Sequence, residues 1–261
     1  MPSPRPATLL TGASSGIGAA LAPHFAREGR NTLVLVARRA EPMEALAASL
    51  RQQHGSEVVV IPADLQAPGA AARLLGELDR LGLYADTLVN NAGYGLSGRF
   101  TDMDLGRITG MMQLNMTALI ELTYGVLPGM RARHQGRIMN VASIAAFQPC
   151  PNFAAYGATK AFVLSFSEAL AIELEKDGVT VTAVCPGSTA TGFHDVSGST
   201  TSLAAKLMDT ADTVAASGYK ALVAGDRVVV TGLLNKPVRL VNRLLPRDWT
   251  ARMTGLLMAS H

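Results

Sequence analysis

The sequence predicts an α/β fold in which a parallel sheet of about seven strands is covered by helices on both faces. Three observations support this prediction: strand-like and helix-like segments alternate, several strand candidates are continuous apolar runs, and the composition suits a large core. Of the 261 residues, 48% are hydrophobic and only 16% are charged. A chain of this length and composition is expected to form a single domain, residues 1–261, without disordered tracts.

Strands are expected where short apolar, β-branched runs are bounded by glycine, proline or polar residues. The clearest is Thr-Leu-Val-Leu-Val at residues 32–36, because an uninterrupted run is typical of a strand buried on both faces of a sheet. The predicted strands are residues 7–11, 31–37, 57–62, 86–90, 136–142, 179–184 and 227–230.

Helix-forming segments separate these strands. The predicted helices are residues 16–28, 41–53, 68–80, 102–133, 153–176 and 203–224. One long irregular stretch, residues 188–202, follows the sixth predicted strand, at the edge of a parallel sheet where ligands bind. Within the single domain, we therefore interpret residues 188–224 as a substrate-side loop and helices, and residues 235–261 as a carboxyl-terminal segment.

Composition excludes several classes of function. The net charge is only +3 and the basic residues are scattered, so nucleic-acid binding is not expected. The two cysteines, Cys150 and Cys185, lack metal-ligand spacing, which predicts reduced thiols and no metal site. Residues 1–6 lack the apolar core of a signal peptide, and no apolar run is long enough to cross a bilayer. These features predict a soluble, cytoplasmic protein.

A glycine-rich turn follows the first predicted strand and leads into a helix. Backbone N–H groups and the helix dipole converge on an anion at such a place, and glycines allow its close approach. A lone turn of this kind is often only a turn, but its place in a β-α-β pattern favours a dinucleotide pyrophosphate. The residues predicted to form this site are Gly12, Ser14, Ser15, Gly16, Ile17 and Gly18.

The end of the second predicted strand bears on the choice of dinucleotide. An acidic residue about 20 positions past the glycine turn binds the ribose 2′-hydroxyl of NAD, whereas arginine accommodates the 2′-phosphate of NADP. Here the chain has Arg38 and Arg39 and no carboxylate, which predicts NADP(H). The alternative is two solvated arginines that begin a helix.

Tyr156 and Lys160 lie four residues apart in a predicted helix, so their side chains share a face. A phenol has a pKa of about 10, and a nearby ammonium stabilises the phenolate and lowers that pKa, as general acid–base catalysis needs. Ser143, at the end of the fifth predicted strand, is placed to hydrogen-bond a substrate oxygen. Taken alone, a Tyr-x-x-x-Lys pair is more typical of a helix surface.

Further motifs follow in order along residues 7–195, and together they resemble the short-chain dehydrogenase/reductase family. The motifs are Thr11-Gly12-x-x-x-Gly16-Ile17-Gly18, Asn90-Asn91-Ala92-Gly93, Asn115, Ser143, Tyr156-x-x-x-Lys160 and Pro186-Gly187. The resemblance implies a Rossmann-type doubly wound sheet and hydride transfer between NADP(H) and a ketone, an aldehyde or the corresponding alcohol. The chain is most similar to a broad group of reductases whose substrates are not defined.

The resemblance also implies what the catalytic residues do. Tyr156 protonates the carbonyl oxygen, Ser143 orients that oxygen, and Lys160 hydrogen-bonds the nicotinamide ribose and lowers the pKa of Tyr156. Asn115 kinks a helix and holds a water that links Lys160 to solvent. Read without the family, an asparagine in a helix is typical of the surface or of a local backbone hydrogen bond.

Other residues are implied to contact the cofactor or a second subunit. Asp64 resembles the residue that meets the adenine amino group, although such an aspartate is otherwise typical of a helix cap. Asn90 is expected to hold the sheet together. The helices at 102–133 and 153–176 resemble those that pair between subunits, which implies a homodimer or homotetramer, with burial against their own sheet as the alternative. The remaining implied cofactor contacts are Leu65, Asn91, Ala92, Gly93, Pro186, Gly187, Thr189 and Thr191.

The expected substrate side is mostly apolar and lacks a cluster of arginine or lysine. This favours an uncharged, lipophilic ketone or aldehyde, although such side chains are more often packing than recognition. Two alternative functions are a non-catalytic NADP-binding sensor or scaffold and a membrane-peripheral reductase of lipid-linked carbonyls. The residues expected to line the substrate side are Leu96, Phe147, Gln148, Phe153 and Phe193, with Met208 as a further candidate.

The carboxyl-terminal segment has three arginines at four-residue spacing, Arg239, Arg243 and Arg247. If helical, they form one basic stripe beside apolar residues, with Trp249 at its end, which would suit an anionic membrane or cover the substrate entrance. Pro246 would end or kink the helix. Membrane contact is not the favoured interpretation: we expect the segment to pack on the domain or on a partner subunit.

Overall fold

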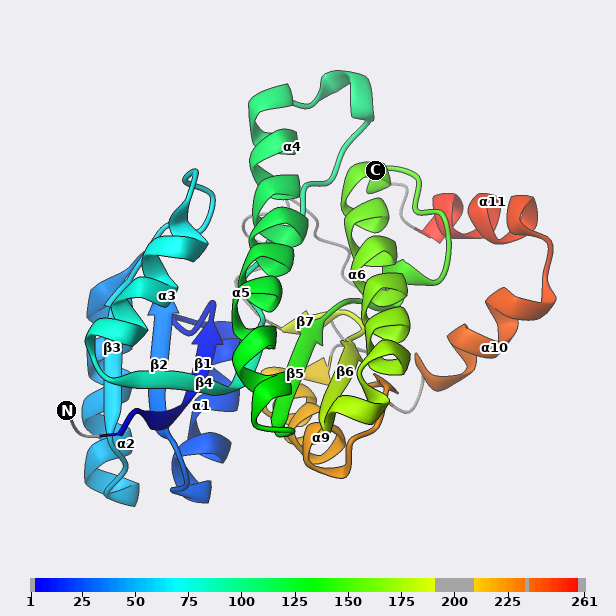
Figure 1. Cartoon of the computed structure of the whole chain (residues 1–261). Coiled ribbons are helices and arrows are strands. Elements are labelled where there is room, and N and C mark those ends of the chain that lie inside the picture. The colour runs from blue at the N-terminus through cyan, green and yellow to red at the C-terminus, as the bar shows by residue number, and fades with distance from the viewer. Residues whose placement is uncertain (1–2, 191–208, 233–234, 258–261) are drawn as a thin grey trace.

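The computed structural model describes residues 3–190, 209–232 and 235–257. Its centre is a seven-stranded parallel sheet with the strand order β3-β2-β1-β4-β5-β6-β9, and helices cover both faces (Figure 1). The strand order reverses its direction between β1 and β4, which makes the sheet doubly wound. The structure therefore confirms the predicted fold class.

All seven predicted strands are present. The bounds differ from those predicted by three residues at most, at β4, whose first residues pair with Arg5, Pro6 and Ala7 of the neighbouring strand. The strands of the sheet are β1 (Arg5–Thr11), β2 (Thr32–Ala37), β3 (Val58–Pro62), β4 (Leu83–Asn90), β5 (Gly136–Val141), β6 (Val179–Cys185) and β9 (Val228–Val230).

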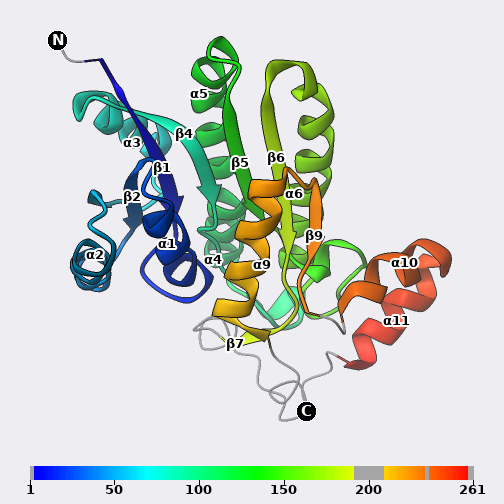
Figure 2. The ribbon, with the colours of Figure 1, turned by 90° about the horizontal axis from the view of Figure 1, so that it is seen from below.

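Helices lie on both faces of the sheet (Figure 2), and each face carries its own apolar core. The helices α1 (Gly16–Glu28), α2 (Ala40–His54) and α9 (Ala211–Ala224) pack against one face. The helices α3 (Ala70–Arg80), α5 (Ala118–Ala132) and α6 (Ala154–Glu173) pack against the other face. Both faces of the central strands are buried for this reason, and their sequences are continuous apolar runs.

The long helix predicted at residues 102–133 is divided. A 3₁₀ turn, η1 (Phe100–Asp102), precedes α4 (Leu105–Met112), and a π-helical turn, η2 (Gln113–Thr117), joins α4 to α5. The Asp104 side chain caps α4 by accepting a hydrogen bond from the Arg107 N–H at 2.8 Å. Such π-helical turns are frequent at functional sites.

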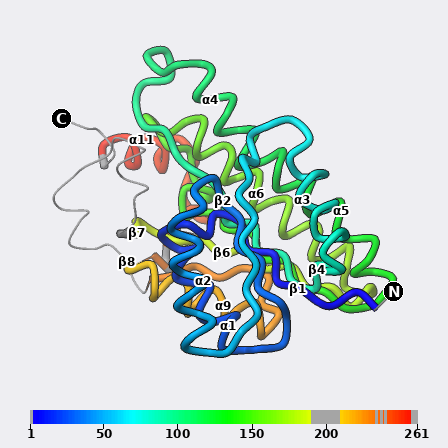
Figure 3. Tube along the Cα trace, turned by 90° about the vertical axis from the view of Figure 1, so that its left-hand side faces the viewer, coloured from blue at the N-terminus to red at the C-terminus, as the bar shows by residue number. Residues whose placement is uncertain are grey.

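Smaller differences occur in the second half of the chain. The predicted helix 153–176 is α6 followed by a 3₁₀ turn, η4 (Glu175–Asp177). In the irregular stretch, β7 (Thr189–Ala190) pairs with β8 (Asp209–Thr210), and residues 191–208 lie outside the described residues. The described part of the carboxyl-terminal segment contains two helices, α10 (Lys236–Leu244) and α11 (Arg247–Leu257), which stand to one side of the sheet (Figure 1). Figure 3 shows α11 from another side.

The helix in this segment ends before Pro246, as expected, so the three arginines do not lie on one continuous helix. The first helix ends at Leu244, and Arg247 begins the second helix. Pro246 lacks the N–H that would continue α10 and fixes the backbone turn between the two helices. The Arg239 side chain lies outside what the structure describes.

Candidate active site

The carboxyl ends of β1 and β4 are joined by side-chain hydrogen bonds. The Thr11 hydroxyl donates to the Val89 carbonyl at 3.0 Å and accepts from the N–H groups of Asn91 and Ala92, each at 3.0 Å. The Asn91 amide donates to the carbonyls of Thr11 and Gly12 at 2.9 and 3.2 Å. These contacts hold the glycine-rich turn against residues 91–93, so the two predicted cofactor segments lie together.

Two glycines of the turn are required by this close approach. A Cβ on Gly12, whose φ is +68°, would lie 2.6 Å from the Asn91 Nδ2, and a Cβ on Gly18 would overlap the Gly12 carbonyl. The helix α1 begins at Gly16, and its first turn, all of which the structure describes, contains no acidic residue. The positive end of this helix dipole is therefore not offset locally, which fits a pyrophosphate.

Exposed arginines lie beside this turn. Arg38 and Arg39 follow β2, both are exposed, and the Arg39 guanidinium lies 3.5 Å from the Ser14 hydroxyl oxygen. Asp64 is exposed at the end of β3, where its carboxylate accepts a hydrogen bond from the Gln66 N–H at 3.0 Å. It does not cap the next helix, because the residue before α3 is Gly69. Leu65, in contrast, is buried in the core, and its side chain is not placed for cofactor contact.

Asn115 is buried in the η2 turn. Its amide donates to the Tyr94 carbonyl at 3.0 Å and to the Thr159 hydroxyl at 3.1 Å, and its oxygen accepts from the Tyr94 N–H at 3.2 Å. It therefore connects the loop after β4 to α6. Gly93 lies against this contact, since a Cβ there would be 2.9 Å from the Asn115 Oδ1 and 3.7 Å from the Lys160 Nζ.

Ser143, Tyr156 and Lys160 meet at the carboxyl end of β5. The Ser143 and Tyr156 side chains share a hydrogen bond, and the Ser143 oxygen also accepts from the Ala145 N–H at 3.1 Å. Lys160 is only 7% exposed, and its ammonium donates to the Val141 carbonyl at 2.7 Å. The ammonium nitrogen is 5.8 Å from the centroid of the Tyr156 ring.

Burial sets the protonation of this group. It raises the pKa of Tyr156 to about 12, although the hydrogen bond with Ser143 acts in the opposite direction and Cys150 adds to the rise. Burial also lowers the pKa of Lys160 to about 8. Lys160 does not offset this rise in the Tyr156 pKa: its ammonium lies 5.8 Å from the Tyr156 ring centroid and donates to the Val141 carbonyl. At neutral pH Tyr156 therefore keeps its proton.

The segment after β6 contributes backbone to the site. The Pro186 carbonyl accepts from the Ile144 N–H at 2.9 Å, which ties the end of β6 to the loop that begins at Ser143. A Cβ on Gly187 would overlap the Asn235 amide. Thr189 is buried, and its hydroxyl donates to the Gly187 carbonyl at 3.0 Å. Thr191 lies outside the described residues.

The predicted substrate residues separate into different environments. Leu96 is buried with Ile108 and Met111, so its role is packing. Phe147 is half-buried and packs on the core around Val163. Phe153 contacts Tyr156 edge to face, with ring centroids 6.1 Å apart. The remaining candidates are Gln148, whose Oε1 accepts from the Asn242 amide at 2.5 Å, and Phe193 and Met208, which lie outside the described residues.

Several contacts were not predicted from the sequence. Thr159 and Tyr94 are the two partners that hold Asn115, and Cys150 lies near enough to influence Tyr156. Asn90 holds the sheet together as expected, but its partner was not predicted: it donates to the Asn140 amide oxygen at 2.9 Å. The Asn140 amide donates to Ser167 at 2.9 Å, so a buried polar chain links β4, β5 and α6. The available signal was Asn140 itself, a polar residue within an apolar strand run.

Two further observations concern metal ions and membranes in the described part of the chain. Among the described residues, no three side chains of His, Cys, Asp or Glu are grouped so that they could hold a metal ion. Within the same part of the chain, each helix is too short or too polar to cross a membrane.

Comparison with known proteins gives consistent similarities. A family model described as short chain dehydrogenase matches residues 6–201. Sulfoacetaldehyde reductase 2 of Chromohalobacter salexigens is 37% identical over 187 residues, which cover 71% of this chain and 73% of that protein. A solved short-chain dehydrogenase from Sphingobium yanoikuyae in complex with NADPH has a TM-score of 0.81 and 33% identity, covering 98% of this chain and 96% of that one.

A second solved structure, the bulky-bulky ketone specific alcohol dehydrogenase from Comamonas testosteroni, has a TM-score of 0.76 and 30% identity, covering 93% of this chain and 95% of that one. The fold, the grouped side chains and the extent of these matches agree. The chain belongs to the short-chain dehydrogenase/reductase family, whose members are NAD(P)(H)-dependent oxidoreductases that act on carbonyl or alcohol groups.

Proposed function

We propose that this protein is an NADP(H)-dependent oxidoreductase that reduces a ketone or aldehyde, or oxidises the alcohol, at Ser143, Tyr156 and Lys160. The observation that carries this proposal is a partly buried, protonated Tyr156 hydrogen-bonded to Ser143, with the buried Lys160 one helical turn away. When bound, NADPH supplies the hydride. The complete set of three side chains argues against a non-catalytic sensor or scaffold.

Each side chain has a role that its contacts support. Tyr156 gives its proton to the carbonyl oxygen as that oxygen gains negative charge, and Ser143 donates a hydrogen bond that orients the same oxygen. Lys160 faces Gly93, where its ammonium binds the ribose hydroxyls. Asn115 fixes the π-helical turn beside α6 and, in this proposal, holds the water that connects Lys160 to solvent.

Replacing Tyr156 with phenylalanine tests the chemistry. Tyr156→Phe removes the transferable proton and keeps the ring that packs against Phe153, so kcat should fall by about 100- to 10,000-fold. Cofactor affinity should stay near that of the wild type, measured by calorimetric titration. A variant that retained most of its kcat would rule out proton transfer by this phenol.

We infer a preference for NADPH from Arg38 and Arg39. Both side chains are exposed beside Ser14, no carboxylate ends β2, and the similar Sphingobium yanoikuyae enzyme binds NADPH. The other proposed contacts belong to the glycine turn, the ends of β3 and β4, and the segment after β6: Gly12, Ser15, Gly16, Ile17, Gly18, Asp64, Asn91, Ala92, Gly93, Pro186, Gly187, Thr189 and Thr191.

Titration with both cofactors tests this preference. One charge-assisted contact to the 2′-phosphate contributes about 1.5–3 kcal/mol, so NADPH should bind roughly 10- to 150-fold more tightly than NADH. Arg38→Gln with Arg39→Gln should bring the two affinities together. Arg73→Gln, a change at an exposed arginine in α3, serves as the control. Equal affinities of the wild type for NADPH and NADH would contradict the proposed preference.

The substrate is proposed to be uncharged and lipophilic. Phe153 is half-buried against Tyr156, Phe147 is half-buried in the same loop, and no cluster of lysine or arginine accompanies them among the described residues. The names of the similar proteins include both a small sulfonate aldehyde and bulky ketones, so this chain's own residues carry the inference. NADPH oxidation with ketones of matched size, with and without a carboxylate, should favour the uncharged member in kcat/KM.

Compartment and assembly follow from the surface and the cysteines. Cys150 and Cys185 are buried thiols that form no disulfide, which suits the reducing cytoplasm. We also propose a homodimer or homotetramer, because α5 leaves apolar side chains, Ile120 and Tyr124, exposed on its outer side.

A further inference from the structure

The helix α11 has its apolar side facing outward. Thr250 and Thr254, one turn apart, are each only 7% exposed, whereas Trp249 is 66% and Leu256 is 80% exposed. Trp249, Met253 and Leu256 are spaced four and three residues apart, so they share one face of the helix. A helix that packs only on its own domain would bury this apolar face and expose the threonines.

Exposed apolar side chains are also present on α10, the helix that precedes α11 and lies beside it (Figures 1 and 2). We define the outer apolar face by its exposed residues: Val241, Leu244, Leu245, Trp249, Met253 and Leu256. An open hollow beside it is lined by Pro246, Asp248, Trp249, Arg252 and Met253. Several exposed apolar side chains on two consecutive helices are typical of an interaction site.

Positive charge is concentrated in the same segment. Residues 236–257 contain five basic residues and one acidic residue, a net charge of +4, whereas the whole chain carries +3. The remainder of the chain is therefore slightly acidic. Arg243, Arg247 and Arg252 are all exposed beside the outer apolar face.

The positive charge of residues 236–257 indicates what kind of partner binds the outer apolar face. A two-fold contact of the face with a second copy would place arginines of one subunit near arginines of the other, which is unfavourable. An anionic lipid surface complements the arginines and accepts the apolar side chains and the indole at the boundary between headgroups and acyl chains.

We propose that residues 236–257 dock the protein on the surface of an anionic lipid bilayer, with both helices lying in the plane of the membrane. The helices have 9 and 11 residues, hence lengths of about 14 and 16 Å, which are too short to cross a hydrocarbon core of about 30 Å.

The docked orientation also involves the loop beside the site. The α10 residue Asn242 donates to Gln148, and Gly255 of α11 lies against Pro151, where a Cβ would be 3.1 Å from the proline ring. Phe153, which contacts Tyr156, belongs to the same loop. Docking therefore places this side of the catalytic group near the membrane, and the docking itself does not depend on the proposed reaction.

Trp249 is the single tryptophan of the chain, so its fluorescence reports directly on this face. The test uses phosphatidylcholine vesicles with and without phosphatidylglycerol, at low and high salt, with no cofactor or substrate. We expect the emission to move to shorter wavelength, and to be quenched by brominated acyl chains, only with phosphatidylglycerol at low salt.

Matched variants test whether vesicle binding depends on the arginines beside the outer apolar face or on the net charge of the whole protein. Arg243→Gln, Arg247→Gln and Arg252→Gln together should weaken vesicle partitioning by about 100-fold. The control triple, Arg27→Gln, Lys176→Gln and Lys220→Gln, removes the same charge from exposed positions on other elements and should leave partitioning within about twofold. Met253→Ser with Leu256→Ser, also at exposed positions, should weaken it at least about tenfold.

Three results would overturn the proposal. The first is no spectral shift with phosphatidylglycerol vesicles at low salt, and the second is an equal loss in the two triple variants. The third is a shift without lipid that follows protein concentration and doubles the mass, which would assign the face to a second copy. Because the measurement contains no substrate, failure here is distinct from failure of the oxidoreductase activity.

Discussion

Lys160 and Tyr156 lie one helical turn apart in α6, and burial moves their pKa values in opposite directions. The pKa of Lys160 falls to about 8, and that of Tyr156 rises to about 12, because the charged form of each side chain loses hydration. Near neutral pH the pair is an ammonium and a neutral phenol. This is the state in which the phenol can donate a proton to a carbonyl oxygen, as the proposed reduction requires.

The buried lysine predicts an unusual dependence of stability on pH. Below about pH 8 both the folded and unfolded chains hold the Lys160 proton; between there and 10.5 the folded chain has lost it while the unfolded chain keeps it. The free energy of unfolding should therefore rise with pH in this window by up to about 3 kcal/mol. Lys160→Met should lack the rise in urea unfolding measured at several pH values.

Tyr156 acts in the opposite sense at higher pH. Between its usual pKa of 10.0 and about 12, the folded chain keeps a proton that the unfolded chain loses, so stability falls. The lysine window is thus best measured below about pH 10. Parallel stability curves for the wild type and Lys160→Met would show that Lys160 titrates normally in the folded protein.

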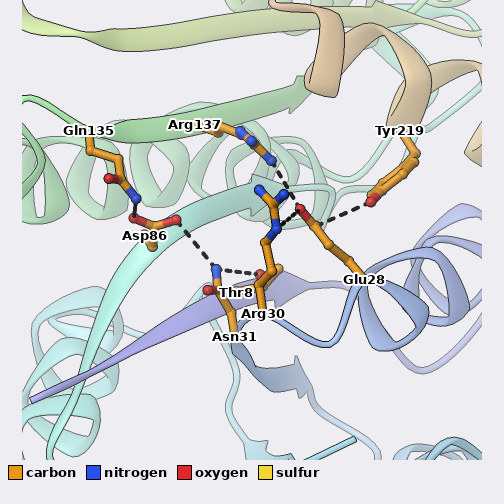
Figure 4. Close-up of polar contacts among 8 residues, drawn as sticks. All are labelled: Thr8, Glu28, Arg30, Asn31, Asp86, Gln135, Arg137 and Tyr219. Carbon is orange, nitrogen blue, oxygen red and sulfur yellow. Dashed lines mark hydrogen bonds and ion pairs between the residues drawn. The ribbon is translucent and has the colours of Figure 1, made fainter. Parts of the chain in front are cut away.

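At the scale of secondary-structure elements, polar contacts decide how helices attach to the sheet. Figure 4 shows a polar cluster that links α1 and α9 to the strands β1, β4 and β5. The Glu28 carboxylate accepts from the Tyr219 hydroxyl at 3.2 Å and pairs with the Arg137 guanidinium at 3.4 Å. Asn31 donates to both Thr8 and Asp86 at 3.4 Å. The cluster therefore connects the carboxyl end of α1 to β5, which lies beyond β4 in the sheet.

Glu28→Gln is expected to destabilise the protein by about 1–2 kcal/mol, because the half-buried Arg137 loses its charged partner. Urea unfolding measures the change. Glu77→Gln is the matched control, since Glu77 pairs with Arg80 on the solvent side of α3 and its loss should leave the free energy of unfolding nearly unchanged. Equal effects of the two substitutions would show that the cluster contributes no more than a surface ion pair.

At the scale of the whole molecule, the helices α5 and α6, which cover one face of the sheet, carry exposed apolar side chains on their outer surfaces. Tyr124 of α5 is 78% exposed, and Ile120, one turn earlier, and Ile172 of α6 are also exposed. Neither Ile120 nor Tyr124 packs into the core between α5 and the sheet. An exposed pair of this kind suits a two-fold interface between subunits.

We expect light scattering to show an oligomer of the 27.3 kDa chain at micromolar concentration. Ile120→Arg with Tyr124→Arg should give the monomer, because it places two charges in a self-complementary apolar contact. Val223→Arg, at an exposed apolar residue of α9 on the opposite face of the sheet, should leave the mass unchanged. A monomeric wild type would contradict the proposed assembly.

The order of strands and helices, the glycine turn and the meeting of Ser143, Tyr156 and Lys160 were all predictable from the sequence. Each depends on a short segment: apolar runs mark buried strands, and Gly12 and Gly18 stand where the backbone must approach residues 91–93. Because the carboxyl ends of parallel strands meet at one edge, residues that follow different strands gather there without further information.

Only the tertiary structure decided the remaining features, because they depend on contacts between distant segments. The direction of the Tyr156 pKa follows from its burial and from the Lys160 contact with Val141. Leu96 belongs to the core since α4 covers it. The sequence period of α11 identifies which residues share its apolar face, but it does not determine whether that face points toward the domain or toward solvent. Because Thr250 and Thr254 pack inward, Trp249 lies on the outside.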